Sequence, residues 1–333
     1  MNKPIRPPIN AQQVADRAGV SRSAVSRTFT EGASVSESTR AKVLRAAADL
    51  GYHVNHLARG LTSQQSGIVC LLIGEIATPY QSALLDVVTR RLQAMGKVVM
   101  VLNTAGQAEA TEAALRQTLN YRADATVVVS GSPSSSLVET CVANGQRVIL
   151  INRDDLLEGT QQILVDSSGA AAEALMMLRR AGCERIAVVS STAGTPSIVA
   201  REVSLSVAAA KAGVDVQLCR FGPTGYATGA ETARQLFASA ARPDGVFCVT
   251  DLLALGFMDA ARKEFGRRVP EDLCVIGFDD IPQAGWAAYE LTTFRQPLDI
   301  MADHIATILE SGCLVEGPIN LPAQTVWRRS VRP

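Results

Sequence analysis

The 333-residue chain has few of the side chains that build metal sites or covalent frameworks. It contains only three histidines, and its seven cysteines are spread singly, with no C-x-x-C pair, mostly in or beside apolar stretches such as GIVCLLIG. Structural zinc sites and disulfide frameworks need clustered ligands. We therefore expect buried, reduced thiols, no metal and no cofactor.

Long apolar runs are also missing. No stretch of 18 apolar residues occurs, and the N-terminal MNKPIRPPIN is followed by polar and charged residues. This pattern excludes a membrane-spanning helix and a secretory signal. Together with the unpaired cysteines, it predicts a cytoplasmic protein.

Catalytic motifs are absent as well. The sequence has no G-x-G-x-x-G after its first apolar strand, no phosphate-binding P-loop and no G-x-S-x-G turn. These motifs mark dinucleotide-binding, nucleotide-binding and hydrolase sites. We expect no enzyme, although a sugar-processing enzyme and a stand-alone solute-binding protein stay as alternatives for an alternating α/β chain.

The formal net charge of zero hides a separation of charge along the chain. Residues 1–65 carry nine Lys and Arg against four Asp and Glu, a net charge of +5, so the remainder carries −5. A basic segment at one end of an acidic protein is typical of polyanion binding confined to that end. Nucleic acid is the partner that this pattern predicts.

The basic segment has the pattern of three short helices, over about 11–18, 22–30 and 37–50. Gly19 and Gly51 are placed to end helices, and Ser21 and Ser36 to cap the next ones. We expect one small core, with these members: Val14, Ala18, Val20, Val25, Val35, Val43, Leu44 and Leu50. The second helix would then expose four side chains: Arg22, Ser23, Ser26 and Arg27. This arrangement predicts a helix-turn-helix whose second helix reads DNA, with a plain three-helix bundle as the alternative.

From residue 66 onward, apolar strands alternate with amphipathic helices in two series that join near residue 165. Such alternation predicts two α/β lobes, each a parallel sheet covered on both faces. Ligands of these folds bind outside the carboxyl ends of the strands. Polar residues at predicted strand ends, with an arginine shortly after one of them, are the candidate binding residues: Asn152, Ser190, Thr250, Asp279 and Arg201. Hydroxyl-rich ligands such as sugars suit this set.

Several segments in a fixed order resemble the lactose-repressor (LacI/GalR) family of bacterial transcription regulators. They include VADRAGVS, VSESTRAKV, N-x-LARGL and RVPEDLCVIGFDDIP, and together they run through nearly the whole chain. The resemblance implies an all-α helix-turn-helix head followed by an α/β core like that of periplasmic binding proteins, made of two doubly wound parallel-sheet lobes. It also implies a homodimer that binds a pseudo-palindromic operator and responds to a small-molecule effector, as a repressor of carbohydrate-utilisation genes.

The resemblance assigns boundaries and further residues. It implies a head at 1–54, a hinge helix at 55–65 and a core at 66–333. The first lobe would take about 66–164 and 296–317, and the second about 165–295 and 318–333. Contact with DNA would extend from Ser21, Arg22, Ser23, Ser26 and Arg27 to the hinge residues Asn55, Ala58 and Leu61. Effector contacts would add Tyr80 to Asn152, Ser190, Arg201, Thr250 and Asp279. The chain departs from the family pattern at Gly60, Gln81 and Thr250, so the effector and the behaviour of the hinge are left open.

Overall fold

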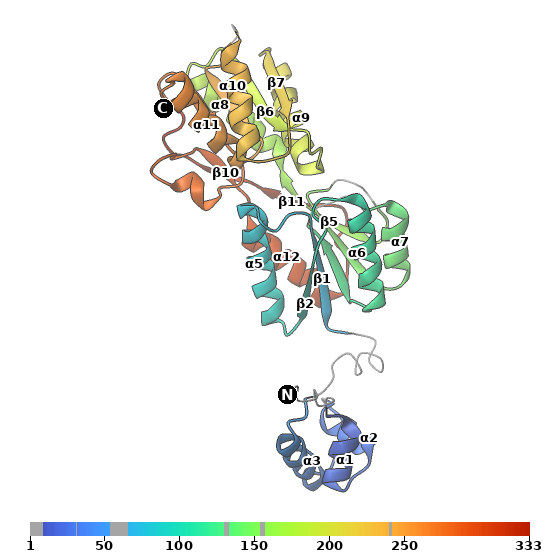
Figure 1. Cartoon of the computed structure of the whole chain (residues 1–333). Helices are drawn as coiled ribbons and strands as arrows, with labels where there is room; N and C mark the ends of the chain where they lie inside the picture. Colours follow the sequence, from blue (N-terminus) through green and yellow to red (C-terminus); the bar gives the residue numbers. More distant parts are fainter. Residues whose placement is uncertain (1–8, 31, 54–65, 130–132, 154–156, 240–241) are drawn as a thin grey trace. The chain divides into compact units, whose positions relative to one another are not determined.

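The computed structural model describes residues 9–30, 32–53, 66–129, 133–153, 157–239 and 242–333. The chain divides into two compact units, the head (Met1–Ser66) and the core (Gly67–Pro333), each with its own hydrophobic interior. Figure 1 shows the elements of both units.

The described helices of the head begin and end at residues suited to those positions. They are α1 (Ala11–Ala18), α2 (Arg22–Thr28) and α3 (Glu37–Leu50). Ser21 and Ser36 cap α2 and α3 as predicted, and Gly51 ends α3 at a φ of 67°. Asn10, which the sequence analysis did not single out, caps α1 in a reciprocal arrangement with Gln13. These caps satisfy backbone N–H groups that a helix start leaves unpaired.

The small core of the head forms where the helices meet, and two predicted members, Val35 and Leu44, are not part of it. Val14, Val25 and Val43 are buried, whereas Leu44 is 47% exposed. The buried stripe of α3 runs through Val43, Ala46 and Ala47 toward the partly buried Leu50. Leu44 lies outside this stripe, because one residue step turns a helix by about 100°.

The first lobe of the core is a parallel sheet with the strand order β11-β5-β4-β3-β1-β2. Its strands are β1 (Ile68–Ile73), β2 (Val98–Asn103), β3 (Ala125–Val128), β4 (Arg147–Ile151), β5 (Thr160–Asp166) and β11 (Ile319–Pro322). Its helices are α5 (Pro79–Ala94), α6 (Ala108–Asn120), α7 (Ser135–Ala143) and α12 (Leu298–Ser311). Strand β1 is buried along its whole length. Its side chains alternate between a cluster shared with α5 and one shared with α6 and α7, so both faces of the sheet are covered (Figure 1).

The second lobe is a parallel sheet with the order β7-β6-β8-β9. Its strands are β6 (Ile186–Ser191), β7 (Val216–Phe221), β8 (Gly245–Cys248) and β9 (Cys274–Ile276). Its helices are α8 (Ser167–Arg180), α9 (Pro196–Lys211), α10 (Tyr226–Ala238) and α11 (Asp251–Phe265). The strand order reverses after β7, so right-handed crossovers place α9 on one face and α10 and α11 on the other. Helices α10 and α11 approach closely at Gly229 and Gly256, where a Cβ atom would lie 2.0 and 1.9 Å from backbone oxygens.

The chain crosses between the lobes in a way that corrects the predicted boundary. Strand β11 pairs in parallel with β5, so residues 319–322 complete the first lobe instead of opening the second. Strand β12 (Gln324–Val326) then pairs antiparallel with β10 (Thr293–Arg295), and Ser330 bonds to β9 of the second lobe. The apolar pattern of INLP indicates a strand but not its partner, because pairing depends on tertiary contacts.

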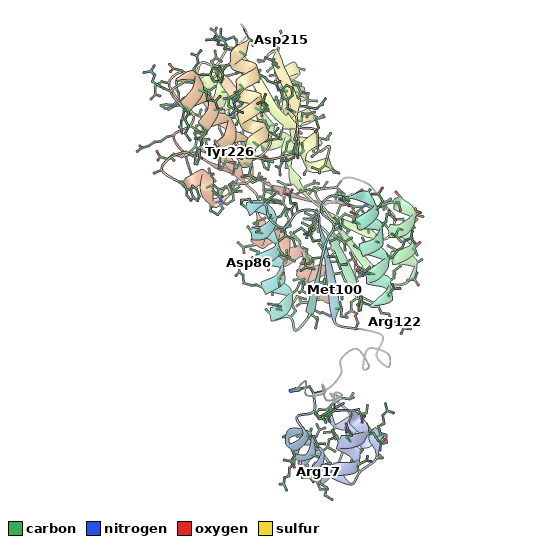
Figure 2. The ribbon with its side chains drawn as sticks, viewed as in Figure 1. Arg17, Asp86, Met100, Arg122, Asp215 and Tyr226 are labelled. Carbon is green, nitrogen blue, oxygen red and sulfur yellow. The ribbon has the colours of Figure 1, made fainter. Side chains whose placement is uncertain are left out.

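Charged side chains project from the outer helices and loops, among them Asp86 of α5 and Asp215 before β7 (Figure 2). In the described part of the chain, no helix combines the length and apolarity needed to cross a membrane. All seven cysteines are free, six of them buried and Cys313 exposed.

Candidate functional site

Two surfaces of the chain carry the predicted functional residues, and the first is the outer face of α2 in the head. Val25 and Thr28 of this helix point into the small core, whereas Arg22, Ser23, Ser26 and Arg27 are exposed. The Ser21 hydroxyl accepts from the Ala24 N–H at 3.2 Å, and Arg40 donates to the Thr28 carbonyl at 2.9 Å. Side chains that lie outside α2, those of Ser21 and Arg40, therefore stabilise the two ends of this short helix.

The exposed arginines of α2 are available to a ligand. Among the described residues, no ion pair or hydrogen bond involves the guanidinium group of Arg22 or of Arg27. Guanidinium groups read guanine edges or phosphates when a helix enters the major groove, and small neighbours such as Ser23 and Ser26 allow close approach. The predicted hinge contacts Asn55, Ala58 and Leu61 lie outside the described residues.

The second surface is a cleft of about 360 Å³ in the core, lined by both lobes. The first lobe contributes the loop after β1 and the start of α5, and the second contributes the start of α9 and residues at strand ends. Four of the six predicted effector residues line it: Tyr80, Arg201, Thr250 and Asp279. The carboxyl ends of the strands of the second lobe thus meet the first lobe at one site, as the alternation predicted.

Arg201 and Asp279 form a buried ion pair at the floor of this cleft. The Arg201 Nη1 donates to Asp279 Oδ1 at 3.1 Å and to the Val249 carbonyl at 2.8 Å. The Arg201 Cζ lies 3.8 Å from the centre of the Phe278 ring. Both side chains are less than a tenth exposed. Burial raises the pKa of the Asp279 carboxyl, and the Arg201 charge opposes that rise.

Gln296, which was not among the predicted effector residues, joins this ion pair to the first lobe. Its Nε2 donates to Asp279 Oδ1 at 2.7 Å, and its Oε1 accepts from the Tyr80 hydroxyl at 2.8 Å. Burial, with a smaller contribution from Asp279, raises the pKa of Tyr80, so the phenol stays a donor. The available signal was a polar residue just before Pro297, where the chain crosses back to the first lobe.

Two predicted effector residues do not line the cleft. Asn152 lies beside it, where its Nδ2 is 3.4 Å from Gln296 Oε1 and its Oδ1 accepts from the Val165 N–H at 2.9 Å. It borders a smaller hollow that shares Arg201 with the cleft. Ser190 is fully buried beneath α9 and lines none of the described pockets. Successive side chains of a strand point to opposite faces of the sheet, so a residue at a strand end can point away from the cleft. The sequence pattern therefore placed Asn152 and Ser190 at strand ends but did not determine whether they face the cleft.

Two further residues complete the surroundings of the cleft. Asp251 follows Thr250 and is fully buried, and its carboxylate accepts from Thr293 Oγ1 at 2.5 Å and the Ile281 N–H at 2.9 Å. Burial, then repulsion by Asp279, raises the pKa of Asp251 to about 7. Gln81 lines the cleft, and its buried Oε1 has no hydrogen-bond partner among the described atoms.

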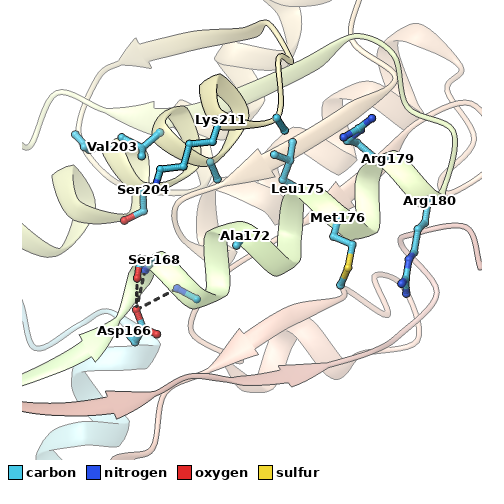
Figure 3. A pocket seen from close by; sticks show the side chains of 14 residues that line it. Asp166, Ser168, Ala172, Leu175, Met176, Arg179, Arg180, Val203, Ser204 and Lys211 are labelled. Carbon is cyan, nitrogen blue, oxygen red and sulfur yellow. Dashed lines mark hydrogen bonds between the residues drawn. The ribbon is translucent and has the colours of Figure 1, made fainter.

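A larger hollow of about 940 Å³ lies between α8 and α9 (Figure 3). Its lining is largely apolar along Leu175, Met176 and Val203, and Asp166 at one end caps α8. It contains none of the predicted effector residues. The cleft between the lobes is therefore the candidate binding site.

Family models match the head and a large part of the core. A model of bacterial regulatory proteins of the lacI family matches residues 11–55, and a model of a periplasmic binding protein-like domain matches residues 175–331. The HTH-type transcriptional regulator GalS of Salmonella typhimurium is 30% identical over 303 residues, covering 90% of this chain and 88% of that protein. The chain belongs to the lacI family of bacterial regulatory proteins.

Other relatives of this lacI-family chain agree. The ribose operon repressor of Bacillus subtilis (strain 168) is 27% identical over 325 residues, covering 96% of this chain and 98% of that protein. These relatives are transcription regulators, which confirms the prediction that the chain is not an enzyme.

Solved structures show that the fold extends over nearly the whole chain. A lac repressor dimer bound to operator and the anti-inducer ONPF has a TM-score of 0.86 at 23% identity, covering 97% of this chain and 99% of that one. The transcriptional regulator CelR in complex with cellobiose has a TM-score of 0.71 at 25% identity, covering 98% and 100%. The predicted head with an α/β core of two lobes is therefore confirmed.

Proposed function

We propose that this lacI-family regulator is a homodimeric, cytoplasmic repressor of carbohydrate-utilisation genes that responds to a sugar or sugar derivative. The observation that carries the proposal is the presence in one chain of an exposed, basic recognition helix and a polar cleft at the strand ends of two lobes. A solute-binding protein needs only the second feature, and an ordinary DNA-binding module needs only the first.

On the DNA side, the proposed contacts are Ser21, Arg22, Ser23, Ser26 and Arg27, with Asn55, Ala58 and Leu61 of the hinge. Helix α2 is capped by Ser21 and presents its unpaired arginines outward. A dimer presents two copies of this helix, so its operator is expected to be pseudo-palindromic. The relative solved with operator bound is itself a dimer, which supports this assembly.

On the effector side, the cleft supplies a guanidinium, a carboxylate, hydroxyls and amides. Tyr80, Arg201, Thr250 and Asp279 line it, and Gln81 offers an amide oxygen that has no partner in the described part of the chain. Such groups match a ring of hydroxyls, each of which donates and accepts hydrogen bonds. Ser190 is buried and Asn152 lies beside the cleft, so direct contact is proposed for the other four.

Coupling between the two sites follows from the position of the cleft between lobes. Tyr80 and Asp279 come from different lobes and are already joined through Gln296. An effector that inserts between them replaces these bonds and favours a different lobe angle, which shifts the equilibrium between DNA-binding states. The direction of the shift, induction or co-repression, is an outcome of the experiment.

The experiment combines a thermal-shift screen of monosaccharides, disaccharides and their phosphates with selection of operator sequences from random duplexes. We expect at least one sugar to raise the melting temperature, and the same sugar to change the affinity for the selected duplex measured by fluorescence anisotropy. A protein that binds sugar but shows no sequence preference on DNA would contradict the proposal in favour of a solute-binding protein.

A further inference from the structure

Two cysteines of the second lobe lie together, away from the cleft. Cys183 is in the loop between α8 and β6, and Cys274 is the first residue of β9. Cys274 is fully buried and Cys183 is 7% exposed. The Cys183 thiol donates to the Asp244 carbonyl at 3.4 Å, and the same carbonyl accepts from the Cys274 N–H at 2.8 Å. The two cysteines therefore lie side by side, because one carbonyl binds both of them.

Gly245 explains how the two thiols come together. Strands β8 and β9 run side by side with Gly245 opposite Cys274. A Cβ atom on Gly245 would lie 2.8 Å from the Cβ of Cys183 and 3.0 Å from its Sγ. The Cys183 side chain therefore occupies the space that a side chain at Gly245 would take. Cys274 lies opposite this position, on the neighbouring strand about 4.8 Å away.

Arg332 binds both sulfur atoms. Its backbone N–H donates to Cys274 Sγ and its Nη2 to Cys183 Sγ, each at 3.5 Å. The guanidinium is fixed by the carbonyls of Ala181 and Pro270, at 2.8 Å each. The Cys183 thiol and Arg332 together lower the pKa of the Cys274 thiol to about 7, although burial and Asp244 oppose this. The thiolate is the nucleophilic form of cysteine, and Cys183 is the member of the pair that retains some exposure.

We propose that Cys183 and Cys274 are a covalent modification site, at which a hydroperoxide converts the two thiols into an intramolecular disulfide. The thiolate sulfur of the pair attacks the terminal peroxide oxygen. The O–O bond breaks, and the leaving oxygen takes up a proton to become water or an alcohol. The sulfur of the second thiol then attacks the resulting sulfenic acid, and the S–O bond breaks. Hydroxide leaves with the proton of the second thiol as water.

This site is separate from the proposed effector site. Cys274 begins β9, whereas Asp279 follows the other end of that strand and lines the cleft. The disulfide would close a loop of about ninety residues within the second lobe and so restrict its unfolded state. We therefore expect the oxidised protein to melt several degrees higher than the reduced one, and a dithiol reductant to reverse the change.

The test uses the full-length chain carrying Cys313→Ser, because Cys313 is the exposed thiol and reacts on its own. The reduced protein is exposed to equimolar hydrogen peroxide at pH 7.5, quenched with an alkylating agent in denaturant and digested without reduction. We expect a linked pair of peptides containing Cys183 and Cys274, and loss of both free thiols at least about ten times faster than of Cys219. Cys219 is the matched control, because it is buried in the same lobe and burial raises its pKa.

Single substitutions separate the pair from general oxidation. Cys183→Ser keeps a hydroxyl donor beside Cys274, so we expect peroxide to leave a sulfenic acid on Cys274 that dimedone traps. Arg332→Gln should slow formation of the link severalfold, whereas Cys219→Ser should leave its rate unchanged. Recovery of both cysteines as alkylated thiols after peroxide, or equal rates at Cys219 and at the pair, would overturn the proposal. These readouts involve neither sugar nor DNA, so failure here does not bear on the proposed function.

Discussion

The chemistry of the cleft is concentrated in a few buried polar side chains. Arg201 and Asp279 pair with each other, and Gln296 extends the pair to Tyr80 of the opposite lobe. Burying a polar group without a hydrogen bond costs free energy of folding. A buried polar side chain is therefore expected to have a hydrogen-bond partner in the protein or in a ligand. The free oxygen of Gln81 is the exception at the cleft and is the group that an effector would satisfy.

Substitution of the ion pair is expected to weaken effector binding selectively. Arg201→Lys loses the planar fork of donors, and Asp279→Asn loses the charge, so each should cost about 1.5–3 kcal/mol of effector affinity. Calorimetry with the sugar identified by the screen measures this loss. Operator binding without effector should stay near wild type, because both residues belong to the core.

The matched control for these variants is Arg234→Ala. Arg234 lies in the same lobe but pairs with Glu264 and Glu231 on the surface of α10 and α11. Effector affinity should not change. Normal effector binding by Arg201→Lys and Asp279→Asn, in proteins with wild-type melting temperatures, would place the pocket elsewhere.

The buried carboxyl of Asp251 predicts a pH dependence of stability. Its folded pKa is raised to about 7, so the folded state holds a proton that the unfolded state has released above about pH 4. Stability should therefore fall as pH rises from about 4 to 7, by an amount on the order of 2–4 kcal/mol. Asp251→Asn can still accept from the Ile281 N–H and can donate to Thr293 Oγ1, so it should remove most of this slope. Urea unfolding at several pH values measures both slopes, and parallel slopes would contradict the assignment.

At the scale of elements, α2 is a short helix that depends on its ends. Its bounds, Arg22–Thr28, allow two turns, and such a helix has little stability of its own. Ser21 supplies the cap at one end, and Arg40 of α3 binds the carbonyl of Thr28 at the other. Recognition of DNA by this helix therefore depends on residues that need not touch a base.

Substitutions at Ser21 separate capping from contact with DNA. Ser21→Ala removes the cap and should lower operator affinity by about 1 kcal/mol, roughly fivefold. Ser21→Asn restores the cap without charge and should recover most of that affinity. Ser21→Asp also restores the cap but places a negative charge next to phosphate, so it should bind more weakly than Ser21→Asn while unfolding at the same urea concentration. Equal affinities for the Asn and Asp variants would show that this helix start lies away from the DNA backbone.

At the scale of the whole molecule, the head and the core are separate compact units with opposite charge. The segment 1–65 has a net charge of +5 and the remainder −5. The described interior of the head shares no member with the interior of the core. This separation allows the core to be studied without the head.

A chain that starts at Gly67 should fold, bind the effector with the affinity of the full-length protein and show no operator binding in a gel shift. For the full-length protein, the logarithm of operator affinity should fall linearly with the logarithm of salt concentration, because basic side chains release counterions from DNA. Arg22→Ala should reduce both the affinity and this slope. Specific binding by the truncated chain would contradict the assignment of DNA binding to the head.

The sequence by itself determined the features that depend on local pattern. Caps such as Ser21 and Ser36, the alternation of strands and helices, and the polar residues that follow strands are fixed by neighbouring residues. Tertiary structure decided which segments pair and which side chains meet. The place of β11 beside β5, the burial of Ser190 and the bridge through Gln296 depend on contacts between residues far apart in the chain. The pairing of Cys183 with Cys274 belongs to the same class, because it requires Gly245 of a third segment to leave the space in which the two thiols meet.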